Sequence, residues 1–298
     1  MKKLIPALCM LLISAVLLGT STYAWFSMSG EVSATGMQVK AATDSDLQIA
    51  IYNGDTKSAF ATTQAVTALA ADSPFLKMIP GTPNYTAADA IDGWYVLDDD
   101  TKANSATDGT VTGFETKGAS KAVDPSAGTV VLGTAPNEQT RGVVLINKFA
   151  IKAKEGSDNT FDKLYVSEIA VTSGTGADAF DPAIRVALKV TQDTDTAWTV
   201  FAPKNDTLGG TSYTTYVKVS DSDSVTPCTV PVKKTGIANA ENILPAGATI
   251  SSTQEVTVEV YIWYEGQDAA CTSSNAMGIT AATSVDIFFA SDDPVTEP

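Results

Sequence analysis

Alternation of apolar and polar residues over short stretches dominates the chain from residue 142 onward and predicts β-strands. The clearest stretch is residues 255–264, in which Val256, Val258, Val260, Ile262 and Tyr264 share one face, and Thr257, Glu259, Tyr261 and Trp263 share the other. Similar stretches lie at residues 142–153, 161–173, 183–191, 198–202, 212–219 and 284–290. Many short strands with turn signals between them predict an all-β fold, a jelly-roll-like β-sandwich with little helix.

The segments before residue 142 have weaker patterns, and we place them all within one domain of residues 43–290. Residues 47–52 predict a strand, whereas the alanine-rich residues 56–71 predict a short helix or an irregular excursion. Residues 72–140 are rich in Gly, Pro, Asp, Thr and Ser, so we expect a long surface insertion, because a second domain would need more buried apolar area. The acidic tail, residues 291–298, is expected to be disordered.

The first 24 residues have the pattern of an export signal. Lys2 and Lys3 precede an apolar run over residues 4–18, and small residues then lead to Ala24. We therefore expect a signal peptidase to cut between Ala24 and Trp25, so that the chain contacts the membrane only as a precursor. The alternative is an uncleaved anchor, although the apolar run is short for a membrane span.

Residues 25–42 follow this signal and predict an exposed strand at the new N-terminus. A free strand that carries apolar side chains invites pairing with a partner. It either completes the protein's own sheet or enters the sheet of a neighbouring copy, where backbone hydrogen bonds supply the affinity. A head-to-tail contact of the second kind does not close and builds a fibre. The apolar members that would mediate this assembly are Trp25, Phe26, Met28, Val32, Ala34, Met37 and Val39.

The charge of the chain narrows the range of partners and activities. The 298 residues include 19 Lys and Arg against 34 Asp and Glu, a net charge of −15, and removal of Lys2 and Lys3 leaves 17 against 34, or −17. This balance disfavours nucleic acid, acidic partners and anionic membranes. The chain has no histidine, which excludes the common zinc-protease motif, Ser-His-Asp triads and Cys-His dyads. No carboxylate pair stands at a spacing that marks a glycosidase, and we expect no enzymatic activity.

Other candidate sites have competing explanations. Cys228 and Cys271 remain after export and would form either a disulfide or two unpaired thiols. Carboxylates are the ligands that Ca²⁺ prefers, but acidic turns are common on an acidic protein and none here has the EF-hand spacing. We therefore expect no cofactor and no metal. The carboxylates with the chemistry for Ca²⁺ are Asp98, Asp99, Asp100, Asp221, Asp223, Asp292 and Asp293.

Aromatic residues suggest an alternative function. A monomeric jelly-roll adhesin or carbohydrate-binding surface protein would stack sugars on exposed rings, whereas packing in the core is the more common use of such side chains. The rings concerned are Trp94, Tyr95, Trp198, Tyr261, Trp263 and Tyr264.

Three segments resemble a known family. Residues 19–27, GTSTYAWFS, resemble the end of the signal in the TasA/camelysin family of secreted Gram-positive biofilm matrix fibre proteins. Residues 33–39, SATGMQV, resemble the first mature strand of related secreted proteins, and residues 263–271, WYEGQDAAC, also resemble those proteins. The length of the chain and the insertion at residues 72–140 depart from the compact family members.

The resemblance implies a jelly-roll subunit located outside the cell, at the cell surface or in the biofilm matrix. It implies cleavage by a dedicated signal peptidase between Ala24 and Trp25. It also implies that copies of the chain form a polymer by donor-strand exchange, with residues 25–39 as the donor. Camelysin has been classed as a metalloprotease, but this activity is not carried over because the chain has no histidine and no zinc-binding motif.

Overall fold

The computed structural model describes residues 37–44, 46–65, 73–76, 78–85, 90–97, 120–124, 126–132, 139–172, 183–208, 211–219, 242–265 and 283–291. Most of these residues lie in β-strands, and no α-helix occurs among them. The short 3₁₀-helix η2 (Pro74–Leu76) interrupts the strands.

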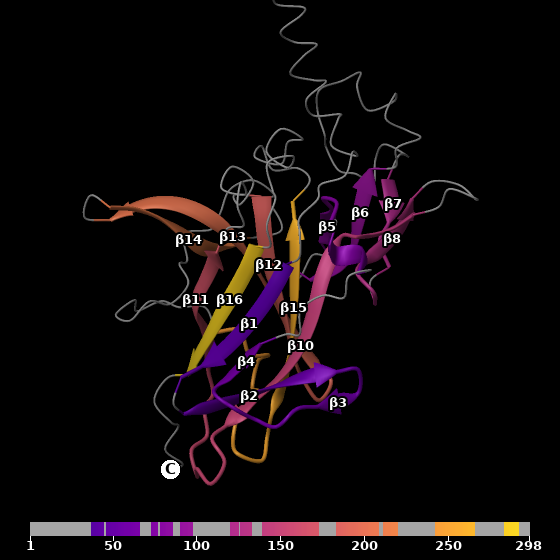
Figure 1. Ribbon diagram of the computed structural model, residues 1–298. Helices are drawn as coiled ribbons and strands as arrows, with labels where there is room; N and C mark the ends of the chain where they lie inside the picture. The colour runs from indigo at the N-terminus through magenta and orange to yellow at the C-terminus, as the bar shows by residue number, and fades with distance from the viewer. Residues whose placement is uncertain are drawn as a thin grey trace, which may run out of the picture.

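Two large sheets form the body of the molecule (Figure 1). The smaller has four strands in the order β11 (Leu164–Thr172), β16 (Thr283–Ser291), β1 (Met37–Thr43) and β4 (Thr63–Ala65). The larger has seven strands in the order β14 (Thr211–Val219), β13 (Asp195–Leu208), β12 (Ile184–Gln192), β15 (Val256–Tyr264), β10 (Val144–Ala153), β2 (Leu47–Asn53) and β3 (Thr56–Lys57). The prediction of an all-β sandwich is confirmed.

The main core lies between these two sheets. Strand β15 shows why the pattern produces it: Val256, Val258, Val260, Ile262 and Tyr264 all belong to the core, in agreement with the predicted face. The four-stranded sheet supplies the opposite wall, to which β1 contributes Val39 and Ala41 and β16 contributes Val285, Ile287 and Phe289. Burial of such apolar side chains is the main force that holds the sheets together.

The described part of the insertion covers part of the outer face of the seven-stranded sheet, the face that points away from the four-stranded sheet. It contributes a three-stranded sheet of β5 (Thr82–Tyr85), β6 (Ile91–Leu97) and β7 (Ser120–Ala122), and a hairpin of β8 (Thr129–Leu132) and β9 (Gln139–Gly142). A second apolar cluster forms where it meets β15, and includes Ile79, Trp94, Val96 and Val130 together with Tyr261 and Trp263. The sequence had not predicted this second cluster.

The helix alternative for residues 56–71 is wrong in the part that the structure describes. Residues 56–57 and 63–65 form β3 and β4 at the edges of the two large sheets, and residues 58–62 follow an irregular course between them. Ser58 fixes this course, because its backbone N–H donates to the Ile51 carbonyl at 2.9 Å and its Oγ accepts from the Ile51 N–H at 3.0 Å. Pairing with the sheet therefore overrides the helix propensity of the alanines.

Candidate assembly site

Strand β1 is the part of the predicted assembly segment that the structure describes. It lies between β16 and β4 (Figure 1), parallel to β16, with Met37 opposite Thr283 and Thr43 opposite Phe289. On its other side it is antiparallel to β4. The first and last described strands of the chain therefore lie side by side in the interior of one sheet.

The side chains of β1 explain why it occupies this position. Val39 is 2% exposed and Ala41 is fully buried, and both point into the main core. Lys40 lies between them and is half-buried, so the strand has the alternation of a sheet with one face on the core. On neighbouring β16, Val285 is the register partner of Val39, and Ile287 is the partner of Ala41.

The two edges of β1 are not equally covered. Strand β16 pairs with all seven residues of β1, from Met37 to Thr43, whereas β4 pairs only with residues 40–42. Within the described ranges, no strand pairs with Met37–Val39 on the β4 side. An unpaired strand edge is a template for another strand.

The turn after β1 ties three strands together. The backbone N–H of Asp44 donates to the carbonyl of Phe289 at 3.1 Å, and the carboxylate Oδ2 of Asp44 accepts from the backbone N–H of Ser291 at 2.9 Å. Thr43 Oγ1 donates to the Leu47 carbonyl at 3.0 Å, which links the turn to the first residue of β2. The end of β1 is therefore anchored at the point where the chain passes from one large sheet to the other.

The predicted site residues divide between described and undescribed parts of the chain. Met37 and Val39 lie in β1, in the protein's own sheet. The cleavage pair Ala24 and Trp25, with the assembly residues Phe26, Met28, Val32 and Ala34, lies outside the described residues. The candidate disulfide of Cys228 and Cys271 and all seven candidate Ca²⁺ carboxylates also lie outside them.

Within the described ranges, Cys, Asp and Glu side chains nowhere gather in groups of three that could hold a metal ion. None of the described residues belongs to a helix long and apolar enough to span a bilayer.

The aromatic residues proposed as a sugar platform are mostly buried. Trp94 is 3% exposed, Tyr261 is 6% exposed, Trp263 and Tyr264 are buried at 0 and 1%, and Trp198 is half-buried. Trp94 packs edge-on against Trp263 at 5.8 Å between ring centroids, and Trp198 lies 5.1 Å from Tyr261. Tyr95 lies in β6, and its side chain is outside the described atoms. The four buried rings are core residues, as the packing alternative expects.

Tyr261 also has a polar partner at the edge of this aromatic group. Its hydroxyl donates to Glu259 Oε2 at 2.6 Å, and the same oxygen forms an ion pair with Lys189 Nζ at 3.2 Å. Burial of the ring, and then the hydrogen bond to Glu259, raise the pKa of the Tyr261 phenol above its ordinary value of 10.0. The phenol is therefore a hydrogen-bond donor over the whole physiological pH range.

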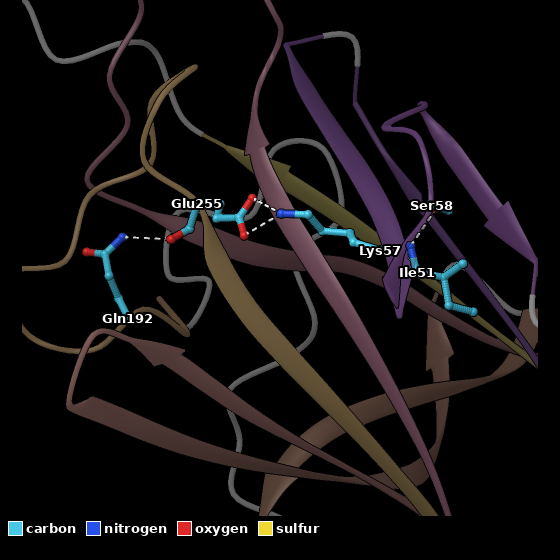
Figure 2. A network of polar contacts seen from close by, with 5 residues as sticks. All are labelled: Ile51, Lys57, Ser58, Gln192 and Glu255. Atoms are coloured by element: carbon cyan, nitrogen blue, oxygen red, sulfur yellow. Dashed lines mark hydrogen bonds and ion pairs between the residues drawn. The ribbon is translucent and has the colours of Figure 1, made fainter. Parts of the chain in front are cut away.

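A group of lysines and rings on the outer face was not predicted from the sequence. Lys57 lies at its centre, where its ammonium Nζ is 2.6 Å from both carboxylate oxygens of Glu255 (Figure 2). Gln192 fixes the backbone of Glu255, because its Nε2 donates to the Glu255 carbonyl at 3.3 Å. Asn53-Gly54 is a hairpin turn signal, and a hairpin there would bring Lys57 beside Tyr52. No local pattern shows that β10, which carries the other two lysines, lies beside β2.

Comparison with protein-family models, curated proteins and solved structures found no match to this chain.

Proposed function

We propose that the chain is an exported, non-enzymatic structural subunit that assembles into extracellular or cell-surface fibres. In this proposal, signal peptidase cuts between Ala24 and Trp25, and the new N-terminal segment, residues 25–39, enters the sheet of a neighbouring copy. The resemblance of residues 19–27 and 33–39 to the TasA/camelysin family suggests this function, and the position of β1 supports it.

The parallel pairing of β1 with β16 is the observation that carries the proposal. A parallel pair needs a long connection, and here the chain from Asp44 to residue 282 separates the two strands. Only the short turn between Thr43 and Leu47 joins β1 directly to β2. Because β16 lies more than two hundred residues after β1, its contacts with β1 do not depend on a short connection and could also be made by β1 of another copy. Exchange of an identical element between copies is a low-cost route to assembly.

The jelly-roll connectivity is part of the same proposal. Two facing sheets and the neighbouring first and last described strands support it. In a fibre of this kind, the twelve residues 25–36 would extend from one subunit to the next. Fully extended, this segment is roughly 40 Å long.

The test compares the chain that begins at Trp25 with a chain that begins at Met37. Both retain every described strand, so the shorter chain keeps Val39 and Ala41 in the core. Electron microscopy should show filaments only for the longer chain, and filaments from both would contradict a role for residues 25–36. A matched control replaces residues 25–36 by a Gly/Ser segment of equal length, which preserves length but removes the apolar side chains, and it should form no filaments.

N-terminal sequencing of the exported protein tests the cleavage step. Recovery of Trp25 as the first residue supports the proposal, whereas recovery of the uncut N-terminus would replace it by an anchored surface protein. A monomer that binds a glycan saturably, with no filaments under any condition, would favour the adhesin instead.

A further inference from the structure

Three lysines gather around two aromatic rings on the outer face of the seven-stranded sheet. Lys57 Nζ lies 5.9 Å from the centre of the Tyr52 ring and 5.1 Å from that of Phe60. Lys148 Nζ lies 4.8 Å from the Tyr52 ring, and Lys152 Nζ lies 4.5 Å from the Phe60 ring. These five residues are called the lysine–aromatic cluster below.

Sheet geometry brings the cluster together from two parts of the chain. Lys57 of β3 is the register partner of Tyr52 of β2, and β2 pairs with β10. Within β10, Phe149 and Ile151 point into the core, so Lys148 and Lys152 point away from it. The negative faces of the rings attract the ammonium groups and offset part of the repulsion among three like charges.

The cluster keeps an excess of positive charge. Glu255 pairs with Lys57, and the side chains of this pair are 35% and 30% exposed. The neighbouring Glu259 is already engaged by Lys189. Three lysines against Glu255 and the exposed Asp55 of the β2–β3 turn therefore leave a local charge of +1, on a chain whose net charge is −15. An exposed positive group on an acidic protein is complementary to anionic surfaces, of which other copies of the chain are one source.

One end of the sandwich provides such a surface. The β1–β2 turn and the β10–β11 loop meet there, because the backbone N–H of Lys154 donates to the Asp46 carbonyl at 2.9 Å and that of Glu155 donates to Gln48 Oε1 at 3.3 Å. The β12–β13 turn lies at the same end, since β12 ends and β15 begins there (Figure 1). The exposed carboxylates of this acidic end are Asp46, Glu155, Asp158, Asp162, Asp193 and Asp195, against the exposed lysines Lys154 and Lys163.

We propose that the lysine–aromatic cluster of one copy docks the acidic end of a second copy. Six carboxylates against two lysines give the acidic end a local charge of −4, which is opposite in sign to the +1 of the cluster. The two patches are different and every copy carries both, so the contact can repeat from copy to copy. Each contact is weak and screened by salt, because the charges are exposed.

Within the proposed fibre, repetition would multiply this weak contact between neighbouring filaments and bundle them. Only this consequence rests on the proposed function. The contact itself does not involve residues 25–36, so it can be measured whether or not filaments form.

Sedimentation velocity of the purified protein is the primary test. It is run at an ionic strength of about 0.1 M, at which salt ions screen the repulsion between the negatively charged copies beyond a Debye length of about 10 Å. We expect association at about 0.1 M salt and its loss at about 1 M. The double variant Lys148→Glu with Lys152→Glu should associate at least tenfold more weakly than the unmodified protein. Unfolding midpoints of all variants are measured alongside. They should fall only slightly, because the substituted side chains are partly or fully exposed and lose at most one contact with a ring each.

A control of matched charge uses the acidic end. Lys154→Glu changes the net charge as much as Lys148→Glu does, but it leaves the cluster intact and makes the acidic end more negative. It should therefore preserve or strengthen association, whereas Lys148→Glu should weaken it. Equal weakening by both variants would show that net charge alone matters, and it would overturn the proposal.

A charge swap makes the test specific. The variant Glu155→Lys with Asp158→Lys should also associate weakly alone, and its mixture with the Lys148→Glu, Lys152→Glu variant should recover association. No recovery in the mixture would overturn the proposal. A second result would also overturn it: the lysine variant associates as strongly as the unmodified protein but no longer binds a polygalacturonate column. That result would show that the cluster binds an acidic glycan instead. Where filaments form, those of the lysine variant should remain single in electron micrographs, and bundling as in the unmodified protein would count against the contact.

Discussion

Trp94 of the insertion stacks on Tyr261 of the central strand β15, with ring centroids 5.2 Å apart and ring planes 22° apart. This pair joins the insertion to the outer face of the seven-stranded sheet, where both rings belong to the second apolar cluster. Offset stacking of buried rings stabilises beyond the area that they bury. The insertion is therefore bound to the sheet by packing rather than by its chain connections alone.

Replacement of Trp94 should destabilise the fold. Trp94→Ala removes a side chain that is 97% buried and leaves a cavity against Tyr261 and Trp263, so we expect a loss of about 3–5 kcal/mol in the free energy of unfolding. Denaturant unfolding followed by circular dichroism measures it. Trp198→Ala, at a half-buried ring of the same group, is the matched control and should cost less.

Trp94→Phe separates packing from hydrogen bonding at this site. The buried Trp94 Nε1 has no hydrogen-bond partner among the described residues, so its removal leaves no partner unsatisfied. We expect Trp94→Phe to cost clearly less than Trp94→Ala. Equal costs for the two would contradict the packing account. The same result bears on glycan assays: a loss of binding in Trp94→Ala would report a disturbed fold before it reported a sugar platform.

The Tyr261 phenol should make the fold sensitive to alkaline pH. Its pKa is raised in the folded state, so the folded protein holds the proton above the ordinary value of 10.0 while the unfolded chain releases it. The proton on Tyr261 therefore contributes its full share to the free energy of unfolding below pH about 10. Above that pH the free energy of unfolding falls, by at most about 1.4 kcal/mol per pH unit for one proton. Tyr261→Phe should reduce this slope, as measured by denaturant unfolding at pH about 8 and about 11. An identical pH slope in Tyr261→Phe would show that other groups are responsible.

Two glycines with positive φ should respond differently to the same substitution. Gly128 has φ +65°, and a Cβ there would lie 1.9 Å from the Val144 carbonyl oxygen. Gly54 has φ +60°, but a Cβ there would have no atom within 4 Å. Gly54→Ala should cost about 1–2 kcal/mol from backbone strain alone, and Gly128→Ala should cost about 1–3 kcal/mol more from the clash. Similar losses for both, in denaturant unfolding, would contradict the close approach of the β8–β9 hairpin to β10.

Strand β15 illustrates what the sequence predicts well. The alternation over residues 255–264 assigns each side chain to the correct face, because successive side chains in a strand point to opposite faces of the sheet. The pattern could not show that the second face is also buried, since its cover comes from Trp94 and the rest of the insertion. Within the insertion, residues 94–97 and 128–132 do predict two short strands, which correspond to parts of β6 and β8, but their pattern does not show that they pack on β15.

The pairing of strands is what the sequence could not supply. Nothing local in residues 37–43 indicates that β1 lies parallel to β16, more than two hundred residues later. The lysine–aromatic cluster has the same origin, because Lys57 and Lys148 meet only through the contact of β2 with β10. The net charge of the chain disfavours acidic partners on average, and it conceals a local group of opposite sign.

Val39 gives a test of whether β1 itself belongs to the donor segment. Val39→Ala removes about two methylene equivalents from a side chain that is 2% exposed, and should cost about 2 kcal/mol in the free energy of unfolding. If β1 is exchanged between copies, the same contacts with Val285 hold the fibre together, so the denaturant midpoint of the filaments should fall as well. Lys40→Ala, at the next residue and off the core, is the matched control and should change either quantity by less than about 0.5 kcal/mol. Filaments of Val39→Ala that resist denaturant as well as the unmodified ones would show that β1 stays in its own subunit, and the donor would then end before Met37.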